Sequence, residues 1–366
     1  MKEISARLGL QQRVMPEYRV PFFDALAGAC PQGVHIFAGH AHESEAIACG
    51  KMVEKALYTE ANNLHLMKGS FYTCVQTNFM QWLEEWQPEV LIVEANPRYL
   101  VTPQAVRWMH ARKRPVIGWG LGAPRTRGIQ EALRYRFLQS LDAIIAYSQT
   151  GAEQYYALGC KTGKIFVAPN AVAAKPTLPA IKRPNMFAGG RPNLIYVGRL
   201  QKRKKLDLLL QACAKLPGSL RPRVTIIGDG PELENLRTIS AQVYEDVEFV
   251  GGKFGAELEP YYKAADLFVL PGTGGLAVQQ AMSYSLPVLV GEADGTQAQL
   301  VRPENGWLVE QMSVDTLADA LQHALQDAAR LRQMGLASYR IVAEEVNLER
   351  MVEGFVDAVN AVASIR

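Results

Sequence analysis

Two basic side chains stand at a glycine-containing turn in the second half of the chain. Gly198 and Arg199 end an apolar run, and Lys204 follows six residues after Gly198 where a helical pattern begins. An arginine and a lysine at a strand-to-helix turn can neutralise a diphosphate as it becomes a leaving group. We therefore take Arg199 and Lys204 as the candidate catalytic residues of a group transfer from a diphosphate.

Further glycine-rich turns follow other apolar runs. Residues 227–231, Ile-Gly-Asp-Gly-Pro, are typical of a strand, a tight turn and a helix start, and residues 271–276 lead into a helix that carries Gln280. Glycine lets backbone N–H groups approach a ligand, and a helix amino end favours negative charge. The candidates for holding the phosphorylated ligand are Gly198, Gly228, Gly230, Pro231, Lys253, Gly274, Gly275, Leu276 and Gln280.

The elements that must position these turns alternate between short apolar runs and longer helical patterns. In the first half, the expected strands are Val34–Ala38, Val90–Val93, Val116–Trp119, Ala143–Tyr147 and Ile165–Ala168. The expected helices there are Phe71–Trp86, Pro103–Arg112, Ile129–Leu141 and Thr150–Leu158. Such alternation predicts a parallel sheet covered by helices on both faces.

A second alternating series follows a segment rich in proline and glycine. Its expected strands are Leu194–Val197, Val224–Ile227, Val247–Val250, Leu267–Leu270 and Pro287–Val290. Its expected helices are Lys205–Ala214, Pro231–Gln242, Pro260–Ala264 and Ala277–Ser283. The chain is therefore expected to be an α/β protein with two Rossmann-like domains. In open parallel sheets, ligands bind beyond the carboxyl ends of the strands, so we expect the two parallel sheets to face a central cleft.

The domain boundaries follow from the same patterns. We expect an N-terminal domain over residues 1–172, a linker over 173–192, a C-terminal domain over 193–340 and a C-terminal helix over 341–366. The linker carries four prolines and two glycines, which cannot continue a helix or a central strand. Apolar positions between Val346 and Ala363 predict a helix that is long enough to cross back to the first domain.

This ordered series of motifs resembles retaining glycosyltransferase family 4, also called group 1, which has the GT-B architecture. The matching residues are Gly198-Arg199-Leu200 with Lys204, Gly228-Asp229-Gly230-Pro231, Ala265-Asp266 before Leu270-Pro271, Ala281-Met282 before Pro287-Val288, Asn170, and Glu304-Asn305-Gly306. The resemblance covers residues 140–310 well and the first 140 loosely. It implies transfer of a sugar from a UDP- or GDP-sugar substrate to a hydroxyl of a glycan or lipid-linked acceptor, without a metal ion or other cofactor.

Two positions depart from the family's pattern. The family usually carries two glutamates separated by seven residues, and this chain has Gly272 and Gln280 there. The Gln280 amide oxygen can still accept a hydrogen bond from the donor ribose. If the leaving phosphate takes the acceptor's proton on one face of the sugar, the protein must neutralise phosphate and position the reactants more than supply a base.

Polar and aromatic residues follow the strands of the first half, where an acceptor would bind. The acceptor-binding candidates are Tyr18, Arg19, Glu94, Asn96, Arg98, Trp119 and Arg125. For Arg19 and Glu94, a surface or interdomain ion pair is an equally good interpretation. For Phe22 and Phe23, packing in the core is favoured.

Basic charge is concentrated in one segment. Between Arg98 and Arg136, nine basic residues stand against a single acid, Glu131, in a chain whose net charge is +3. This bias favours an anionic acceptor or an acidic membrane surface, with a solvated basic face as the alternative. We expect no nucleic-acid partner, because no recognised nucleic-acid motif accompanies the charge, and no metal site, because neither an Asp-x-Asp pair nor a His/Cys cluster is present.

The start of the chain lacks the apolar stretch of a signal peptide, and no apolar run reaches the ~20 residues that span a bilayer. We therefore expect a cytoplasmic protein, with weak peripheral attachment to the inner face of the membrane. Two other functions fit the same fold. One is a non-catalytic nucleotide-sugar-binding protein, which Gly272 and Gln280 motivate. The other is a nucleotide-sugar epimerase, which would need an acid–base pair that the sequence does not reveal.

Overall fold

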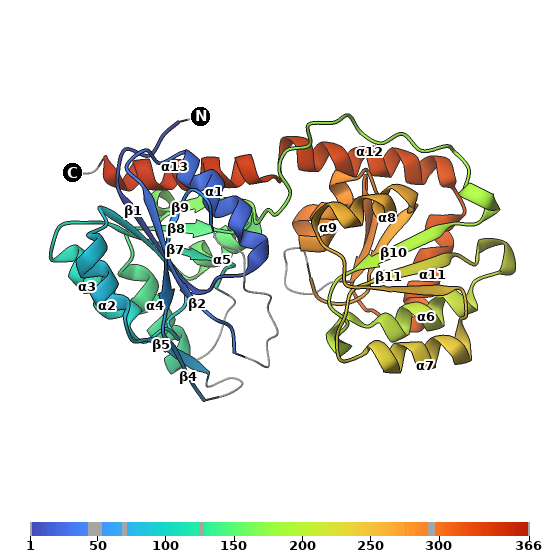
Figure 1. Ribbon diagram of the computed structural model, residues 1–366, viewed down its shortest axis with the longest axis horizontal. Coiled ribbons are helices and arrows are strands. Elements are labelled where there is room, and N and C mark those ends of the chain that lie inside the picture. Colours follow the sequence, from blue (N-terminus) through green and yellow to red (C-terminus); the bar gives the residue numbers. More distant parts are fainter. Residues whose placement is uncertain are drawn as a thin grey trace. The chain divides into compact units, whose positions relative to one another are not determined.

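The computed structural model describes residues 2–42, 53–67, 72–123, 128–274, 276–291 and 297–364 of the chain. The chain divides into two compact units (Figure 1). The first unit comprises Met1–Val172 together with Leu348–Arg366, and the second comprises Ala173–Asn347. Each is an α/β body built around a parallel main sheet, as the alternating patterns predict.

The main sheet of the first unit has seven strands in the order β3-β2-β1-β6-β7-β8-β9. The strands are β1 (Leu8–Val14), β2 (Val34–Gly39), β3 (Leu57–Ala61), β6 (Val90–Glu94), β7 (Val116–Gly120), β8 (Ala143–Ala146) and β9 (Ile165–Val167). A separate antiparallel hairpin is formed by β4 (Asn63–Leu66) and β5 (Thr73–Gln76). All five strands predicted in this half are present, and the apolar runs of β2, β6, β7 and β8 are largely buried because helices cover both faces of the sheet.

Two separate apolar clusters pack on the two faces of this sheet. The helices of the unit are α1 (Val20–Gly28), α2 (Phe79–Trp86), α3 (Thr102–His110), α4 (Ile129–Gln139), α5 (Gln149–Ala157) and α13 (Leu348–Ala363). Helices α1 and α13 contribute to one cluster, in which the Phe22 and Phe355 rings lie 4.8 Å apart. Phe22 and Phe23 are fully buried, which confirms their predicted core packing. The final helix also packs on the first unit as predicted, against α1, β8 and β9.

The sheet of the second unit has six strands in the order β12-β11-β10-β13-β14-β15. The strands are β10 (Asn193–Val197), β11 (Arg223–Ile227), β12 (Val247–Gly251), β13 (Leu267–Leu270), β14 (Val288–Gly291) and β15 (Gly306–Val309). The helices are α6 (Leu206–Lys215), α7 (Leu233–Val243), α8 (Glu259–Ala264), α9 (Leu276–Ser283), α10 (Gln297–Leu300), α11 (Val314–Leu325) and α12 (Ala328–Glu344).

Short 3-10 helices connect several of these elements. They are η1 (Glu17–Arg19), η4 (Thr162–Lys164), η5 (Ala188–Gly190), η6 (Lys202–Lys204), η7 (Gly218–Leu220) and η8 (Gly255–Leu258). Of these, η1 follows β1 in the first unit and η6 follows β10 in the second.

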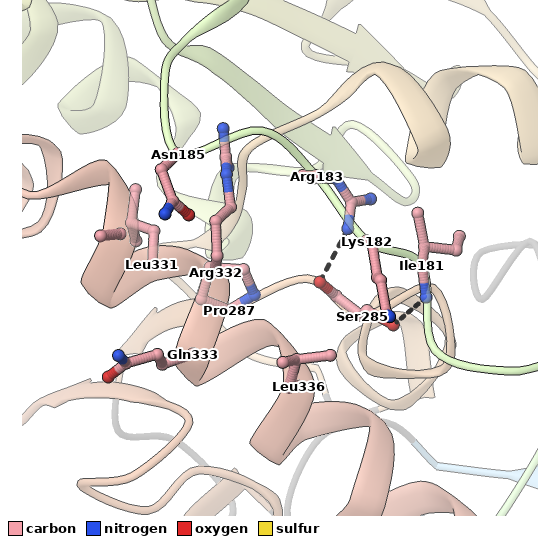
Figure 2. Close-up of a pocket in the computed structure, with 11 residues that line it drawn as sticks. Ile181, Lys182, Arg183, Asn185, Ser285, Pro287, Leu331, Arg332, Gln333 and Leu336 are labelled. Carbon is pink, nitrogen blue, oxygen red and sulfur yellow. Dashed lines mark hydrogen bonds between the residues drawn. The ribbon is translucent and has the colours of Figure 1, made fainter.

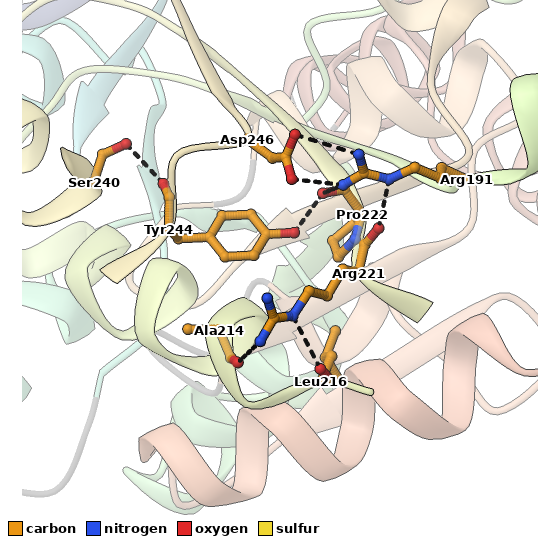
Figure 3. Close-up of polar contacts among 8 residues, drawn as sticks. All are labelled: Arg191, Ala214, Leu216, Arg221, Pro222, Ser240, Tyr244 and Asp246. Atoms are coloured by element: carbon orange, nitrogen blue, oxygen red, sulfur yellow. Dashed lines mark hydrogen bonds and ion pairs between the residues drawn. The ribbon is translucent and has the colours of Figure 1, made fainter. Parts of the chain in front are cut away.

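Arg191 and Arg221 stabilise the turns that precede β10, β11 and β12 (Figure 3). The Arg221 guanidinium donates to the carbonyls of Ala214 (3.1 Å) and Leu216 (3.3 Å), where α6 ends. A cation at a helix carboxyl end satisfies carbonyls that lack helical partners. Arg191 pairs with Asp246 at 2.7 Å, and this hydrogen bond holds the pKa of the Asp246 carboxyl below its usual value.

Several expectations differ from the structure. The helix predicted over Phe71–Trp86 is wrong in its first half, since Thr73–Gln76 form β5 and α2 begins at Phe79. The buried Gln76 amide donates to the Gln12 carbonyl at 3.1 Å, a long-range contact that a local pattern does not reveal. Local sequence patterns predict no counterpart for the strands β3, β4 and β15 or for the helices α1, α10, α11 and α12.

The predicted linker lies along the second unit rather than between two bodies. The Ile181 N–H donates to the Ser285 hydroxyl at 2.9 Å, and the Tyr339 hydroxyl donates to the Leu178 carbonyl at 2.6 Å. Helix α12 continues to Glu344, so the chain returns to the first unit between residues 347 and 348 and not at 340.

Candidate active site

The turns that carry the candidate site residues of the second unit meet at the carboxyl ends of its central strands. Strand β10 pairs in parallel with β11 on one side and with β13 on the other. The strand order reverses between β10 and β13, and in open α/β sheets ligands bind at such a switch point. The turn after β10 carries Arg199 and Lys204, and the loop after β13 carries Gly272, Thr273 and Gly274.

These two segments contact each other directly. Lys204 Nζ donates a hydrogen bond to the Thr273 carbonyl. The carbonyl of the neighbouring Arg203 accepts a hydrogen bond from the Thr273 N–H at 3.2 Å. The Nη1 atom of Arg203 donates a second hydrogen bond to the Thr273 hydroxyl at 2.8 Å. The lysine that the sequence singles out is thus held on the glycine-rich loop, at the edge of the sheet where a ligand would bind.

Close backbone packing explains why glycine occupies the loop after β13. A Cβ atom at position 272 would lie 2.0 Å from the Arg203 carbonyl oxygen. Gly274 has φ +146°, and a Cβ there would lie 2.7 Å from Lys204 Nζ. A glutamate at position 272 would therefore displace the turn that carries the basic residues. Close packing of this loop thus explains why the chain has glycine where the family usually has its first glutamate.

The glycines after β10 and β11 pack on each other in the same way. The Gly198 N–H donates to the Ile227 carbonyl at 2.9 Å. A Cβ at Gly228 would lie 2.0 Å from the Gly198 oxygen, and one at Gly230 would lie 2.2 Å from the Leu200 oxygen. All three glycines have φ between +140° and +157°. They bring the two turns into contact, and this packing is a structural reason for glycine beside any role in binding.

The remaining candidate residues of this unit lie on separate turns and helices. Arg199 is half-buried, and its carbonyl accepts from the Tyr196 hydroxyl at 3.0 Å. Lys253 follows β12 and pairs with Glu257 at 3.7 Å. Pro231 is exposed after the Gly228–Gly230 turn, Leu276 begins α9, and Gln280 lies half-buried on the same helix. Gly275 lies outside the described residues.

Gln279, next to the predicted Gln280, has a role that the sequence did not indicate. Its side chain is fully buried. The Oε1 atom accepts from the Ala173 N–H at 3.2 Å, and Nε2 donates to the Val346 carbonyl at 2.7 Å. One amide therefore binds the chain where it enters the second unit and where it leaves it. Two adjacent glutamines on a helix give no local signal of which one faces inward.

In the first unit, the strand order reverses between β1 and β6, and Arg19 and Glu94 lie where these strands end. Arg19 is only 4% exposed. Its guanidinium donates to the Asn170 side chain and lies 5.2 Å from the Trp119 ring and 5.8 Å from the Tyr147 ring. Arg19 therefore packs inside the first unit rather than on its surface.

Glu94 is held by groups around the switch point of the first sheet. Its carboxylate accepts the Arg13 N–H at 2.6 Å, and its own N–H donates to the Gln11 side chain at 3.1 Å. Desolvation raises the pKa of the Glu94 carboxyl, although the Arg13 N–H, Tyr99 and the charges of Arg13 and Arg19 act in the opposite direction. A carboxyl of this kind retains its proton to higher pH than an exposed one.

The other acceptor candidates are divided between core and surface. Trp119 is 1% exposed and packs between Phe22 and Phe355, so its ring presents no surface to an acceptor. Asn96 shapes a turn by accepting the Arg98 N–H at 3.1 Å. The accessible candidates are Arg98 and Tyr18, both exposed. Arg125 lies outside the described residues.

Within the described ranges, no three His, Cys, Asp or Glu side chains are grouped so that they could hold a metal ion. In the same part of the chain, no helix combines the length and apolar character needed to cross a membrane.

Comparison with known proteins finds a family match within the second unit. Residues 179–340 match the family model described as glycosyl transferases group 1. A GDP-mannose-dependent alpha-(1-6)-phosphatidylinositol monomannoside mannosyltransferase of Mycobacterium tuberculosis is 34% identical over 166 residues, which are 41% of this chain and 42% of that protein. The sulfoquinovosyl transferase SQD2 of Arabidopsis thaliana is 32% identical over 40% of this chain and 29% of its own length. The alignments thus span less than half of these relatives.

Solved structures resemble the whole chain in fold. Anabaena HepE in complex with UDP and glucose matches with a TM-score of 0.68 at 14% identity, covering 97% of this chain and 99% of that one. A sucrose-phosphate synthase from Thermosynechococcus elongatus matches with a TM-score of 0.69 at 19% identity, covering 98% and 99%. At these identities the likeness shows the fold alone, which is the predicted GT-B type with two Rossmann-like bodies.

Proposed function

From the premise that residues 179–340 form a group 1 glycosyl transferase domain, we propose that this chain is a retaining glycosyltransferase. It transfers a sugar from a UDP- or GDP-sugar to a hydroxyl of a glycan or lipid-linked acceptor. The observation that carries the proposal is the contact of Lys204 with the glycine-rich loop after β13, at the switch point of the second sheet. A cation fixed at that place can meet the diphosphate of a donor.

The reaction needs charge neutralisation and positioning. The bond between the sugar's anomeric carbon and the diphosphate oxygen breaks, and a bond from that carbon to the acceptor oxygen forms on the same face. The acceptor's proton passes to the leaving diphosphate. Arg199 and Lys204 stabilise the negative charge that develops on the leaving group. Because the phosphate itself takes the proton, the chemistry requires neither a carboxylate base nor a metal ion.

In the proposal, the donor rests on the loops after β10, β11 and β13. Helix α9 begins at Leu276, shortly after Gly274 in the same loop, and the partial positive charge of a helix amino end favours a bound phosphate. Gln280, further along the same helix, supplies one amide oxygen for the ribose hydroxyls. Tyr18, Arg98 and the Glu94 region supply acceptor contacts in the first unit.

The alternative is a nucleotide-sugar-binding protein without turnover. It is favoured by one observation, the absence of side chains at Gly272 and of a carboxylate at Gln280, where the family usually has two glutamates. Such a protein would bind a nucleotide-sugar and leave it intact. An epimerase has less support, because an acid–base pair is not evident among the described residues at the carboxyl end of the second sheet.

The test has two stages. Thermal unfolding in the presence of individual nucleotide-sugars identifies the donor, since a ligand at about 100 times its Kd adds about 2.7 kcal/mol of stability. Release of UDP or GDP from that donor is then followed with and without lipid-linked and free glycan acceptors. Acceptor-stimulated release supports the transferase. Stabilisation without any release supports the binding protein, and stabilisation by no nucleotide-sugar contradicts both.

A further inference from the structure

A second cationic site lies in the second unit, at the other end of its sheet from the loops described above. An open pocket of about 330 Å³ lies between the segment before β10 and helix α12 (Figure 2). Its polar lining comes from Lys182, Arg183, Asn185, Ser285, Arg332 and Gln333. Ser285 and Pro287 precede β14, which places the pocket at the amino end of that strand.

The charges around this pocket do not balance. Lys182, Arg183 and Arg332 line it, and its lining includes no acidic residue. The carboxylate of Asp266 pairs with one of these cations, Arg332, at 2.7 Å and also accepts the Asn193 N–H at 2.8 Å. Asp266 offsets one of the three positive charges, so an excess of two remains.

Both arginines are held firmly by backbone carbonyls. Arg183 donates to the Ser285 carbonyl at 2.8 Å and to the Tyr262 carbonyl at 2.9 Å, as Figure 2 shows for Ser285. Arg332 Nε donates to the Pro184 carbonyl at 2.7 Å. The two guanidinium groups are therefore fixed in position before any ligand arrives, which lowers the entropy cost of binding.

Two donors of these arginines have no partner among the described residues. Arg332 Nη1 and Arg183 Nε are buried and make no hydrogen bond there. The Arg332 side chain is 9% exposed. Buried donors of this kind are uncommon in native proteins, because leaving one unsatisfied costs about 1–3 kcal/mol. Burial and, after it, the charge of Arg332 also lower the pKa of Arg183 to about 10.

We propose that this pocket binds the phosphate group of a small phosphorylated molecule. A phosphate monoester carries close to two negative charges at neutral pH and three acceptor oxygens, which matches the cationic lining of the pocket. The apolar side chains of Ile181, Leu331 and Leu336 line the rest of the pocket. The volume exceeds that of an inorganic ion and falls at the lower end of the range for small-molecule sites.

The site includes the segment that enters the second unit from the first. Lys182 and Arg183 belong to residues 173–192, and Asn185 follows them. A phosphate bound between this segment and α12 would add contacts that hold it on the second unit. The proposal does not depend on the transferase activity, since the donor loops lie at the carboxyl ends of the strands.

The test is calorimetric titration of the full chain with inorganic phosphate at constant ionic strength, compared with acetate. Four variants are titrated alongside the natural protein. Arg332→Ala is avoided, because it would leave the buried Asp266 unpaired and endanger folding. Lys182→Ala removes an exposed lining charge, and Arg183→Lys keeps the charge but removes the fork of donors. Arg340→Ala is the matched control, since Arg340 is an exposed arginine of α12 outside the pocket. Lys204→Ala reports on the donor loops.

The expected result is that phosphate binds more tightly than acetate, with Kd weakened about threefold by Lys182→Ala and about tenfold by Arg183→Lys. Arg340→Ala and Lys204→Ala should leave this Kd unchanged. The proposal is overturned if the natural protein binds phosphate no better than acetate. It is equally overturned if Lys204→Ala abolishes phosphate binding while the two pocket variants retain it, because the ion would then occupy the donor loops.

Discussion

Lys204 Nζ donates to the backbone carbonyl of Thr273, which joins the turn after β10 to the loop after β13. The two residues are 69 positions apart in the sequence, and the contact spans the point where the strand order reverses. A ligand phosphate arriving there would meet an ammonium that is already oriented. The first prediction follows from this contact.

Replacing Lys204 with Ala should reduce turnover by about 10²- to 10³-fold, because one well-placed donor to developing charge is worth about 3 kcal/mol. The measurement is the rate of nucleoside diphosphate release at saturating donor. Lys202→Ala is the control, since Lys202 is an exposed lysine of the same 3-10 helix. Equal rates in the Lys204 and Lys202 variants, with the fold intact by circular dichroism, would remove Lys204 from the mechanism.

Gln279→Leu should destabilise the protein and leave the chemistry of the donor loops in place. The change removes two hydrogen bonds and leaves the Ala173 N–H and the Val346 carbonyl without this partner. We expect a loss of about 2 kcal/mol and a fall in Tm of roughly 4–8 °C. The neighbouring Gln280→Leu variant should melt close to the natural protein, because Gln280 is only half-buried. A Tm loss in the Gln280 variant as large as that in Gln279→Leu would contradict this assignment.

The stability of the Glu94→Gln variant relative to the natural protein should rise with pH. The pKa of Glu94 is raised in the folded state, so its contribution is fully present below the unfolded value and is lost as pH rises through the folded pKa. An uncharged amide avoids that loss. The measurement is the difference in Tm between the two proteins at pH 4, 6 and 8.

Glu345→Gln supplies a control of opposite sign. The Arg302 hydrogen bond lowers the pKa of Glu345, so that carboxylate stabilises the fold above its unfolded pKa and the contribution is lost as pH falls through the folded pKa. The Gln variant should therefore lose stability relative to the natural protein as pH rises from 4 to 8. If the stability of both variants relative to the natural protein changes with pH in the same direction, desolvation does not set the pKa of Glu94.

Turnover should persist in excess EDTA, because in the proposed mechanism Arg199 and Lys204 neutralise the leaving diphosphate. The assay compares donor consumption after chelator treatment with and without added Mg²⁺ or Mn²⁺. Activity that disappears in EDTA and returns with either ion would replace the arginine–lysine mechanism with a metal-assisted one.

The basic segment between Arg98 and Arg136 is predicted to attract an acidic membrane surface. Arg107, Arg112 and Lys113 are exposed, whereas Arg114 donates to Gln87 and to the Pro88 carbonyl and so supports the fold. Charge reversal at Arg112 and Lys113 should therefore weaken binding to acidic vesicles, by about 1 kcal/mol per residue at low salt. Co-sedimentation with acidic and neutral vesicles at two ionic strengths measures it. Equal retention on both kinds of vesicle at low salt would leave the segment as a solvated face.

Local sequence patterns are sufficient to predict the parallel architecture and the glycine-rich turns that carry the candidate donor-binding residues. Strands such as β6 and β13 are buried on both faces, so their residues form continuous apolar runs that can be recognised without any partner. The edge strand β3, with the sequence Leu-Tyr-Thr-Glu-Ala, is mostly accessible and carries no such run, and it was missed. Glycines with positive φ mark turns for a reason that is equally local.

Whether a polar or aromatic residue faces a ligand depends on what packs against it. Trp119 ends a strand that was correctly predicted, yet its ring is buried because α13 returns from the end of the chain and places Phe355 against it. Gln279 and Gln280 are adjacent and chemically identical. The Gln279 side chain hydrogen-bonds the segments that enter and leave the second unit, whereas Gln280 is half-buried on the same helix. The proline-rich segment is predicted to be a linker, and in the structure Ser285 and Arg332 hold it on the second unit. Periodicity reports on one element at a time, whereas burial is set by contacts between residues far apart in the sequence.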